Sequence, residues 1–203
     1  MSLVAEQKVI AFSGSTRSDS YNKKLVLQAS EIAKQMGATV TVIDLKDYPI
    51  PFYDGDLEDK KGLPKKAKQL RDLMKSSDAM IIASPEYNGS VSAILKNTLD
   101  WMSRGEKGGY SPEAFKGKKF AIMSASPGNG GGARGLAHLK QIIENAGGEV
   151  VPTKVSIKQA QTAFNEKGVI INPAVKKELQ AEIRELLQTN SQENNPWLLE
   201  SED

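Results

Sequence analysis

Side chains that bind oxyanions gather in one short stretch near the start of the 203-residue chain. The hydroxyl donors in it are Ser15, Thr16, Ser18 and Ser20. Arg17 adds a planar, permanently charged guanidinium that can donate two parallel hydrogen bonds to one anion. Gly14 permits a tight turn just before them. These residue types at this spacing are suited to holding a phosphate group.

The segments on either side would position these donors at the start of a helix. Residues 9–12 form a short apolar run that is typical of a buried strand. After Asn22, apolar residues follow at helical spacing, namely Leu25, Ala29, Ile32 and Met36. A loop between such elements brings free backbone N–H groups and the positive end of the helix dipole together. Residues 8–25 therefore predict a phosphate site. The alternative is an ordinary capped helix start, since Ser and Asp favour caps.

Strands and helices alternate along the rest of the chain. Apolar runs predict further strands at residues 39–43, 78–84, 120–125 and 149–152. The last of these can extend toward Ile157. Helical spacing predicts helices within residues 63–74, 91–102, 136–146 and 173–187. Residues 44–61, which contain three aromatic side chains, are predicted to form an ordered loop over the strand ends.

This alternation predicts an α/β fold, a flavodoxin-like three-layer sandwich in which helices cover both faces of a five-stranded parallel sheet. The expected strand order is 2-1-3-4-5. A single domain would span residues 1–203, with a polar C-terminal tail from about residue 189. Ligands of such sheets bind beyond the carboxyl ends of the strands, where the strand order reverses. The loops at residues 14–22, 85–90 and 126–132 would therefore form one composite pocket.

Composition excludes several kinds of chemistry. The chain has no cysteine, so disulfides, thiolate nucleophiles and Cys-ligated metals are ruled out. The 27 basic residues exceed the 25 acidic ones by only two, which gives no sign of a nucleic-acid partner. No apolar run reaches the ~20 residues of a membrane span, and no signal segment is evident, so a cytoplasmic protein is expected. His138, the only histidine, is expected on a helix as a surface or packing residue.

Two loops allow more than one interpretation. Residues 128–133 satisfy the dinucleotide pattern GxGxxA, with Glu149 about 20 residues on, but this run follows the fourth strand and not the first. Residues 85–90 could be a plain connector, or they could line a planar ring with packing from Tyr87 and a hydrogen bond from Asn88. No acid, base or metal constellation accompanies the phosphate loop. A cofactor that carries the chemistry itself would suit such a site.

Three motifs together resemble the NADPH-dependent FMN reductase family. Gly14-Ser15-Thr16-Arg17 with Ser20 and Asn22 is similar to its GSxRxxSxN phosphate loop. Pro85-Glu86-Tyr87-Asn88-Gly89-Ser90, continued by Leu95-Lys96-Asn97 and Asp100-Trp101, is similar to its PEYNxSxPxxLKNxxDW segment. Ser126 with Gly131-Gly132-Ala133-Arg134 resembles its third loop. The resemblance covers residues 8–155 and includes the bacterial quinone, azo and chromate reductases. Ser92 stands where the family commonly has proline, which predicts a looser entry to the following helix.

The resemblance implies a bound FMN and a set of residues around it. The phosphate would be held by Ser15, Arg17, Ser20, Tyr21 and Asn22. The isoalloxazine would be bordered by Pro85, Glu86, Tyr87 and Asn88. The third side would be closed by Ser126 and Arg134. No catalytic side chain and no metal ligand is implied, because the flavin carries the chemistry.

The implied activity is a ping-pong oxidoreductase reaction. Hydride would pass from NADPH or NADH to flavin N5, and then to a quinone, an azo compound, free flavin or a metal oxyanion such as chromate. A homodimer or homotetramer is implied, with helix 91–104 as a candidate interface because Trp101 and Met102 add apolar surface beyond one stripe. The alternatives are a flavodoxin-type electron carrier without NAD(P)H turnover, although such carriers are strongly acidic, and a regulatory module that has lost the chemistry.

Overall fold

A central parallel sheet organises the computed structural model, which describes residues 7–188. Its strands are β1 (Lys8–Ser13), β2 (Thr39–Asp44), β3 (Ala79–Ala83), β6 (Lys119–Ala125), β7 (Glu149–Val150) and β8 (Ser156–Ile157). They lie in the order β2-β1-β3-β6-β7, with β8 also paired to β6, and every pair is parallel. This arrangement confirms the predicted order 2-1-3-4-5, with β7 and β8 sharing the fifth position.

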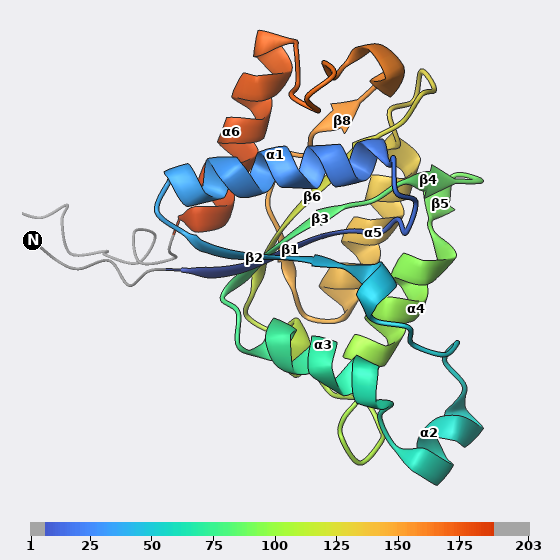
Figure 1. The fold of residues 1–203 in the computed structure, drawn as a ribbon. Helices are drawn as coiled ribbons and strands as arrows, with labels where there is room; N and C mark the ends of the chain where they lie inside the picture. Colours follow the sequence, from blue (N-terminus) through green and yellow to red (C-terminus); the bar gives the residue numbers. More distant parts are fainter. Residues whose placement is uncertain (1–6, 189–203) are drawn as a thin grey trace, which may run out of the picture.

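Helices cover both faces of the sheet (Figure 1). One face carries α1 (Tyr21–Gln35) and α6 (Pro173–Leu187). The other carries α3 (Lys65–Lys75), α4 (Ala93–Met102) and α5 (Ala133–Asn145). Neighbouring residues of one strand serve different cores, because side chains alternate across a sheet. Ala11, for example, packs with Leu25 of α1, whereas Phe12 packs with Leu99 of α4. The predicted three-layer sandwich is confirmed.

The fifth strand is interrupted in its middle. β7 pairs with the start of β6 and β8 with its end. Pro152 lies between them and has no N–H to donate to a ladder. Carboxyl groups of α6 replace the missing sheet acceptors: the Thr153 N–H donates to Glu185 Oε2 at 2.9 Å, and the Val155 N–H donates to Glu182 Oε2 at 2.9 Å. The sheet edge is therefore completed by side chains.

Two regions expected to be irregular contain regular structure. The predicted loop 44–61 holds a short 3₁₀ helix, η1 (Leu45–Asp47), and α2 (Gly55–Lys61), which is capped by the Asp54 carboxylate. After β3, the chain forms a small antiparallel hairpin of β4 (Glu86–Tyr87) and β5 (Ser90–Val91). Further short 3₁₀ helices are η2 (Pro112–Ala114) and η3 (Ala160–Thr162).

Trp101 and Met102 do not add outer apolar surface to helix 91–104, contrary to the reason for which this helix was predicted as an interface, because both side chains are fully buried within the chain. The segment that follows β2 covers this side of α4. Trp101 Nε1 donates to the Pro51 carbonyl at 2.8 Å, and its ring meets Tyr53 edge to face with centroids 5.0 Å apart. The second apolar stripe of α4 is therefore explained by a long loop, which helical periodicity cannot reveal.

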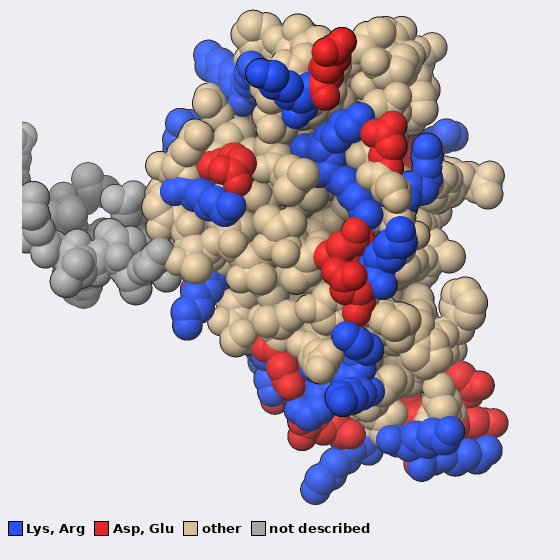
Figure 2. All heavy atoms as spheres, viewed as in Figure 1, with Lys and Arg blue, Asp and Glu red and all other residues tan. Residues whose placement is uncertain are grey.

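Surface charge is mixed on the face shown in Figure 2, where basic and acidic side chains lie among one another. Within residues 7–188, no helix is both long enough and apolar enough to cross a bilayer. The predicted polar tail from about residue 189 lies outside the described residues.

Candidate functional site

The loop after β1 is pinned to two neighbouring elements. The Gly14 N–H donates to the Ala83 carbonyl at the end of β3, at 2.8 Å. The Gly14 carbonyl accepts from Ser92 Oγ at 2.6 Å. A Cβ on Gly14 would lie 2.9 Å from the Leu95 side chain, so only glycine lets the loop pass this close to α4. Residues 14–22, called the phosphate loop below, therefore start from a fixed position.

Ser92 tightens the entry to α4, so the expectation of a looser entry is wrong. Its hydroxyl accepts from the Leu95 N–H at 3.3 Å while it donates to the Gly14 carbonyl. The side chain is buried, with 4% exposed. A proline, which has no side-chain hydroxyl, could make neither the hydrogen bond to the Gly14 carbonyl nor the one from the Leu95 N–H. Serine at this position thus joins the phosphate loop to the helix start.

The start of α1 keeps its anion-binding groups available. Ser20 is the N-cap residue, yet its side chain makes no capping hydrogen bond within the described chain. The first turn of α1 has no acidic residue, so no neighbouring carboxylate there opposes an anion. Asp19, just before it, is paired with Lys24 at 2.7 Å. Ser15 is buried and its Oγ accepts from the Arg17 N–H at 3.3 Å, which shapes the loop from within.

Asn22 connects the phosphate loop to the third loop. Its Nδ2 donates to the Ala125 carbonyl at 2.9 Å, and its Oδ1 accepts from the Ala125 N–H at 2.9 Å. The amide is buried, with 3% of the residue exposed. Since Ala125 is the last residue of β6, this pair of hydrogen bonds fixes the first turn of α1 beside residue 126. Asn22 contributes chiefly as a tether, and its backbone N–H lies in the first turn.

The hairpin of β4 and β5 forms the second loop. Asn88 and Gly89 at its tip have φ angles of 52° and 78°, the left-handed conformation that a two-residue hairpin turn requires. Tyr87 stands half-exposed beside this tip. The segment is therefore a short antiparallel hairpin whose register is set by the Asn-Gly turn.

Glu86 of this ribbon holds the third loop. Its Oε2 accepts from the Gly135 N–H at 3.0 Å, and its Oε1 accepts from Arg134 Nε at 3.1 Å and pairs with Nη2 at 3.0 Å. The Gly135 N–H and the Arg134 guanidinium lower the pKa of the Glu86 carboxyl against the effect of burial. Glu86 is therefore ionised at neutral pH and links two loops.

The glycine run before α5 serves close packing on β6 and β8. Gly131 and Gly132 have φ angles of 62° and 87°, and a Cβ on either would overlap a hydroxyl, of Ser156 and Ser124 respectively. Glu149 pairs in register with Lys119 at the amino end of β6, opposite the edge that carries the glycines. It cannot act as the ribose-binding acid of this loop. The dinucleotide interpretation of residues 128–133 is therefore wrong.

A hollow of about 270 Å³ lies where the three loops meet. It is lined by Arg17, Ser20, Tyr21, Asn22, Pro85, Glu86, Tyr87, Ala125, Ser126 and Pro127. Most residues singled out in the sequence are thus brought together. The exceptions are Ser15, which lies within the loop, Asn88, which lines the neighbouring hollow of the hairpin, and Arg134, which is engaged with Glu86. Sequence reasoning missed Ala125 and Pro127, which flank Ser126 and had no motif of their own.

The sequence profile of the NADPH-dependent FMN reductase family matches residues 7–162, which include all three loops. The chain belongs to this family. It is an oxidoreductase that depends on FMN and NAD(P)H. The family match also confirms the resemblance that the three motifs suggested.

Three relatives illustrate the match. The NAD(P)H-dependent FMN reductase PA1204 of Pseudomonas aeruginosa is 33% identical over 182 residues, which cover 88% of this chain and 92% of that protein. A probable NADPH:quinone oxidoreductase 2 of Oryza sativa is 34% identical over 177 residues, covering 85% and 83%. The solved structure of FerB, a flavoenzyme NAD(P)H:(acceptor) oxidoreductase from Paracoccus denitrificans, is 28% identical with a TM-score of 0.74, covering 89% and 94%.

The residues at this edge fit FMN. Arg17, Ser20 and the helix start offer charge-assisted and neutral donors of the kind that a terminal phosphate accepts. Beneath the third loop, the buried hydroxyls of Ser124 and Ser156 have no hydrogen-bond partner among the described residues. Neither residue lines the hollow, and a Cβ on Gly132 or Gly131 would overlap these hydroxyls, so they lie against the glycine run. His138 stays apart on the surface of α5, 3.0 Å from Ser90 Oγ, as expected.

Proposed function

We propose that this enzyme transfers electrons from NAD(P)H to a small acceptor in two half-reactions, at an FMN held in the three-loop hollow. The observation that carries the proposal is the convergence of three loops on one hollow beside a helix start whose N-cap side chain, Ser20, makes no capping hydrogen bond within residues 7–188. Arg17 and Ser20, with the backbone N–H groups of Tyr21 and Asn22, would hold the phosphate. Ser15 would support the loop from within.

The other two loops would border the ring. Pro85 and Tyr87 offer one apolar side and Ser126 a hydroxyl on the other. FMN, when bound, supplies a site that accepts a hydride from NAD(P)H and passes it to the acceptor. Glu86 cannot serve as a proton donor at neutral pH, because its pKa is lowered and both oxygens are engaged. The chain therefore contributes binding and orientation, in keeping with a reaction that needs no side-chain acid.

Quinones are the acceptor class we favour, with azo compounds, free flavin and oxyanions such as chromate as further candidates. Support comes from the Oryza sativa relative, which is named a quinone oxidoreductase. Tyr87, with 49% of its surface exposed at the rim, leaves that side of the hollow open to a planar molecule. A homodimer or homotetramer in the cytoplasm completes the proposal, and light scattering of the purified protein measures the assembly.

Spectroscopy and turnover test this function together. Purified protein should absorb at about 450 nm, bleach on addition of NADPH or NADH, and oxidise either nucleotide continuously when a quinone is present. A colourless protein that does not take up FMN would contradict the proposal. A full flavin complement without turnover would instead favour a flavodoxin-type electron carrier.

A further inference from the structure

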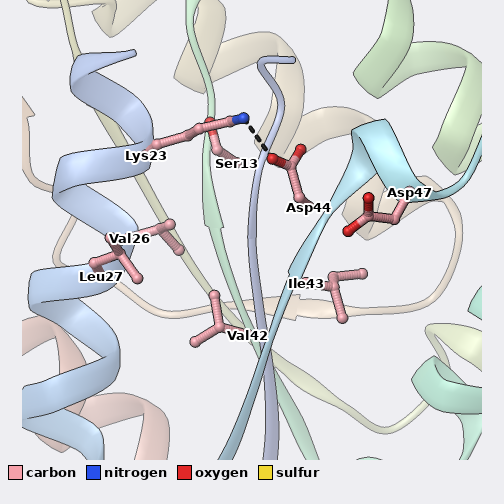
Figure 3. Close-up of a pocket in the computed structure, with 8 residues that line it drawn as sticks. All are labelled: Ser13, Lys23, Val26, Leu27, Val42, Ile43, Asp44 and Asp47. Carbon is pink, nitrogen blue, oxygen red and sulfur yellow. Dashed lines mark hydrogen bonds and ion pairs between the residues drawn. The ribbon is translucent and has the colours of Figure 1, made fainter. Parts of the chain in front are cut away.

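The first turn of α1 is held from both sides. Asn22 ties it to β6 through Ala125, as described above. On the opposite side, Lys23 Nζ donates to Asp44 Oδ2 at 2.5 Å, at the end of β2 (Figure 3). The side chains of Lys23 and Asp44 are 20% and 35% exposed, so water reaches the pair only in part. The turn that carries the proposed phosphate donors is thus fixed to two strands.

Asp44 has a second role that its other oxygen performs. Oδ1 accepts from the Lys46 N–H at 3.0 Å and thereby caps the short helix η1. Burial raises the pKa of the Asp44 carboxyl, but the hydrogen bonds from Lys23 and Lys46 outweigh burial and leave the pKa below its ordinary value. The carboxylate is therefore charged at neutral pH.

Apolar packing between α1 and β2 is incomplete next to this ion pair. A hollow of about 310 Å³ lies there, with Val26 and Leu27 of α1 facing Val42 of β2 (Figure 3). Leu27 and Val42 are 50% and 39% exposed. Since side chains do not fill the space between the two elements, the ion pair is the polar contact that bridges them at this end. Loss of the pair would leave the first turn tied to β6 through Asn22 but no longer to β2.

We propose that the Lys23–Asp44 pair is a clasp that positions the start of α1 for the FMN phosphate. In this role Lys23 does not bind the phosphate; it holds the turn so that the N–H groups of Tyr21 and Asn22 face the anion. The inference rests on the proposed function, because it places the phosphate at this loop. Its rival is that the Lys23 ammonium itself attracts the phosphate, with Asp44 as a competing partner.

The substitution Asp44→Asn separates the clasp from a phosphate-binding role of Lys23, because the two roles predict opposite changes in the Kd for FMN. Asparagine keeps an Oδ1 acceptor for the Lys46 N–H, so the η1 cap is retained while the charge is lost. A clasp predicts that the Kd for FMN rises about three- to fivefold, as expected for the loss of a partly exposed ion pair. A phosphate-binding Lys23 predicts the opposite, a lower Kd, because the freed ammonium gains a partner. Titration of flavin-free protein with FMN, followed by flavin fluorescence, measures the change.

Lys23→Met, and the double variant that combines it with Asp44→Asn, complete a double-mutant cycle. Methionine keeps the aliphatic packing, and the clasp predicts a similar rise in Kd for this variant. The double variant should be no weaker than the weaker single variant, because both substitutions remove the same contact. Additive losses would overturn the proposal. Lys34→Met is the matched control, since Lys34 is a lysine of the same helix paired with Glu31 at its far end; its Kd should match that of the wild type.

Riboflavin distinguishes phosphate positioning from general loosening of the site, because it lacks the phosphate. Asp44→Asn should leave the riboflavin Kd unchanged, and an equal loss for both flavins would overturn the clasp. The variant Ser15→Ala/Arg17→Ala separates this inference from the proposed function. If it binds FMN as the wild type does, the proposed site is wrong. If it loses FMN while Asp44→Asn binds FMN normally, the clasp alone is wrong.

Discussion

Two polar regions of this protein differ in how their hydrogen-bonding groups are used. In the phosphate loop, Ser20 at the start of α1 makes no capping bond within the described chain. Around Glu58 of α2, by contrast, the carboxylate is 3% exposed and accepts from Arg104 Nε at 2.8 Å, Tyr53 Oη at 2.8 Å and the Gly109 N–H at 3.0 Å. We call these four residues the Glu58 cluster.

The difference separates a ligand site from a structural one. The Arg104 Nε, Tyr53 hydroxyl and Gly109 N–H donors of the Glu58 cluster each reach a carboxylate oxygen. The Arg104 guanidinium, followed by Tyr53, lowers the pKa of Glu58 against the effect of burial. Such a network stabilises the segment over α4 without any added molecule. The phosphate loop leaves donors unmatched, and this is favourable only if a ligand or water accepts from them. Substitutions in the two regions should therefore affect different measurements.

The largest effect is expected in the phosphate loop. Ser15→Ala combined with Arg17→Ala should raise the Kd for FMN on the order of 100-fold, because the charge-assisted donor Arg17 is removed together with the Ser15 hydroxyl that shapes the loop. Fluorescence titration measures the Kd, and the thermal midpoint of the flavin-free protein serves as the control and should change little. An unchanged Kd would show that the phosphate loop does not bind the FMN phosphate.

Glu58→Gln should produce the reverse pattern. The neutral amide leaves Arg104 without its carboxylate, so we expect the free energy of unfolding to fall by about 2 kcal/mol. Urea unfolding measures the loss, and FMN affinity of the folded variant should stay near that of the wild type. If the variant loses FMN affinity while keeping its stability, the Glu58 cluster belongs to the site and the distinction fails.

Glu182 offers a contrast to Glu58, because its carboxyl group is also buried but has few hydrogen-bond partners. Burial raises its pKa to about 8, although the Val155 N–H lowers it, and its Oε1 has no partner among the described residues. Between pH 4.5, the ordinary pKa of a glutamate, and about pH 8, the folded protein keeps this proton while the unfolded chain releases it. Stability should therefore fall as pH rises through this window, by at most about 1.4 kcal/mol per pH unit.

Glu182→Gln tests whether stability falls as pH rises because of this carboxyl group. The variant should lose this part of the pH dependence, so that its stability relative to the wild type increases steadily from pH ~5 to pH ~8. Urea unfolding at several pH values measures the difference. Equal pH dependence in both proteins would show that Glu182 is ionised in the fold and that one backbone donor suffices to hold it.

The sequence predicted most of the fold and the order of the site loops. Apolar runs and helical spacing located the main strands and helices, because these signals arise from residues close together in the chain. They could not show α2, which depends on its Asp54 cap within a polar segment, or the cover that this segment lays over Trp101. The break in the fifth strand at Pro152 was also missed, because the acceptors that permit it come from α6.

Within the site, residue types were predicted better than their contacts. The motifs identified Asn22, Glu86 and Arg134, yet the structure turns these side chains toward Ala125 or toward each other. Asn22 and Ala125 are 103 residues apart in sequence, and Glu86 and Arg134 are 48 apart. Such pairings depend on how strands stack in the sheet, which no local pattern specifies.

By itself, the sequence determined that a strand ends in a loop of hydroxyls and Arg17 before a helix, because turn chemistry and periodicity are local properties. Tertiary structure alone decided that this loop is clamped at Gly14, tied to β6 by Asn22 and tied to β2 by Lys23. It also decided that the three loops share one hollow. The physical reason is that parallel strands bring their carboxyl ends to one edge only after distant segments have paired.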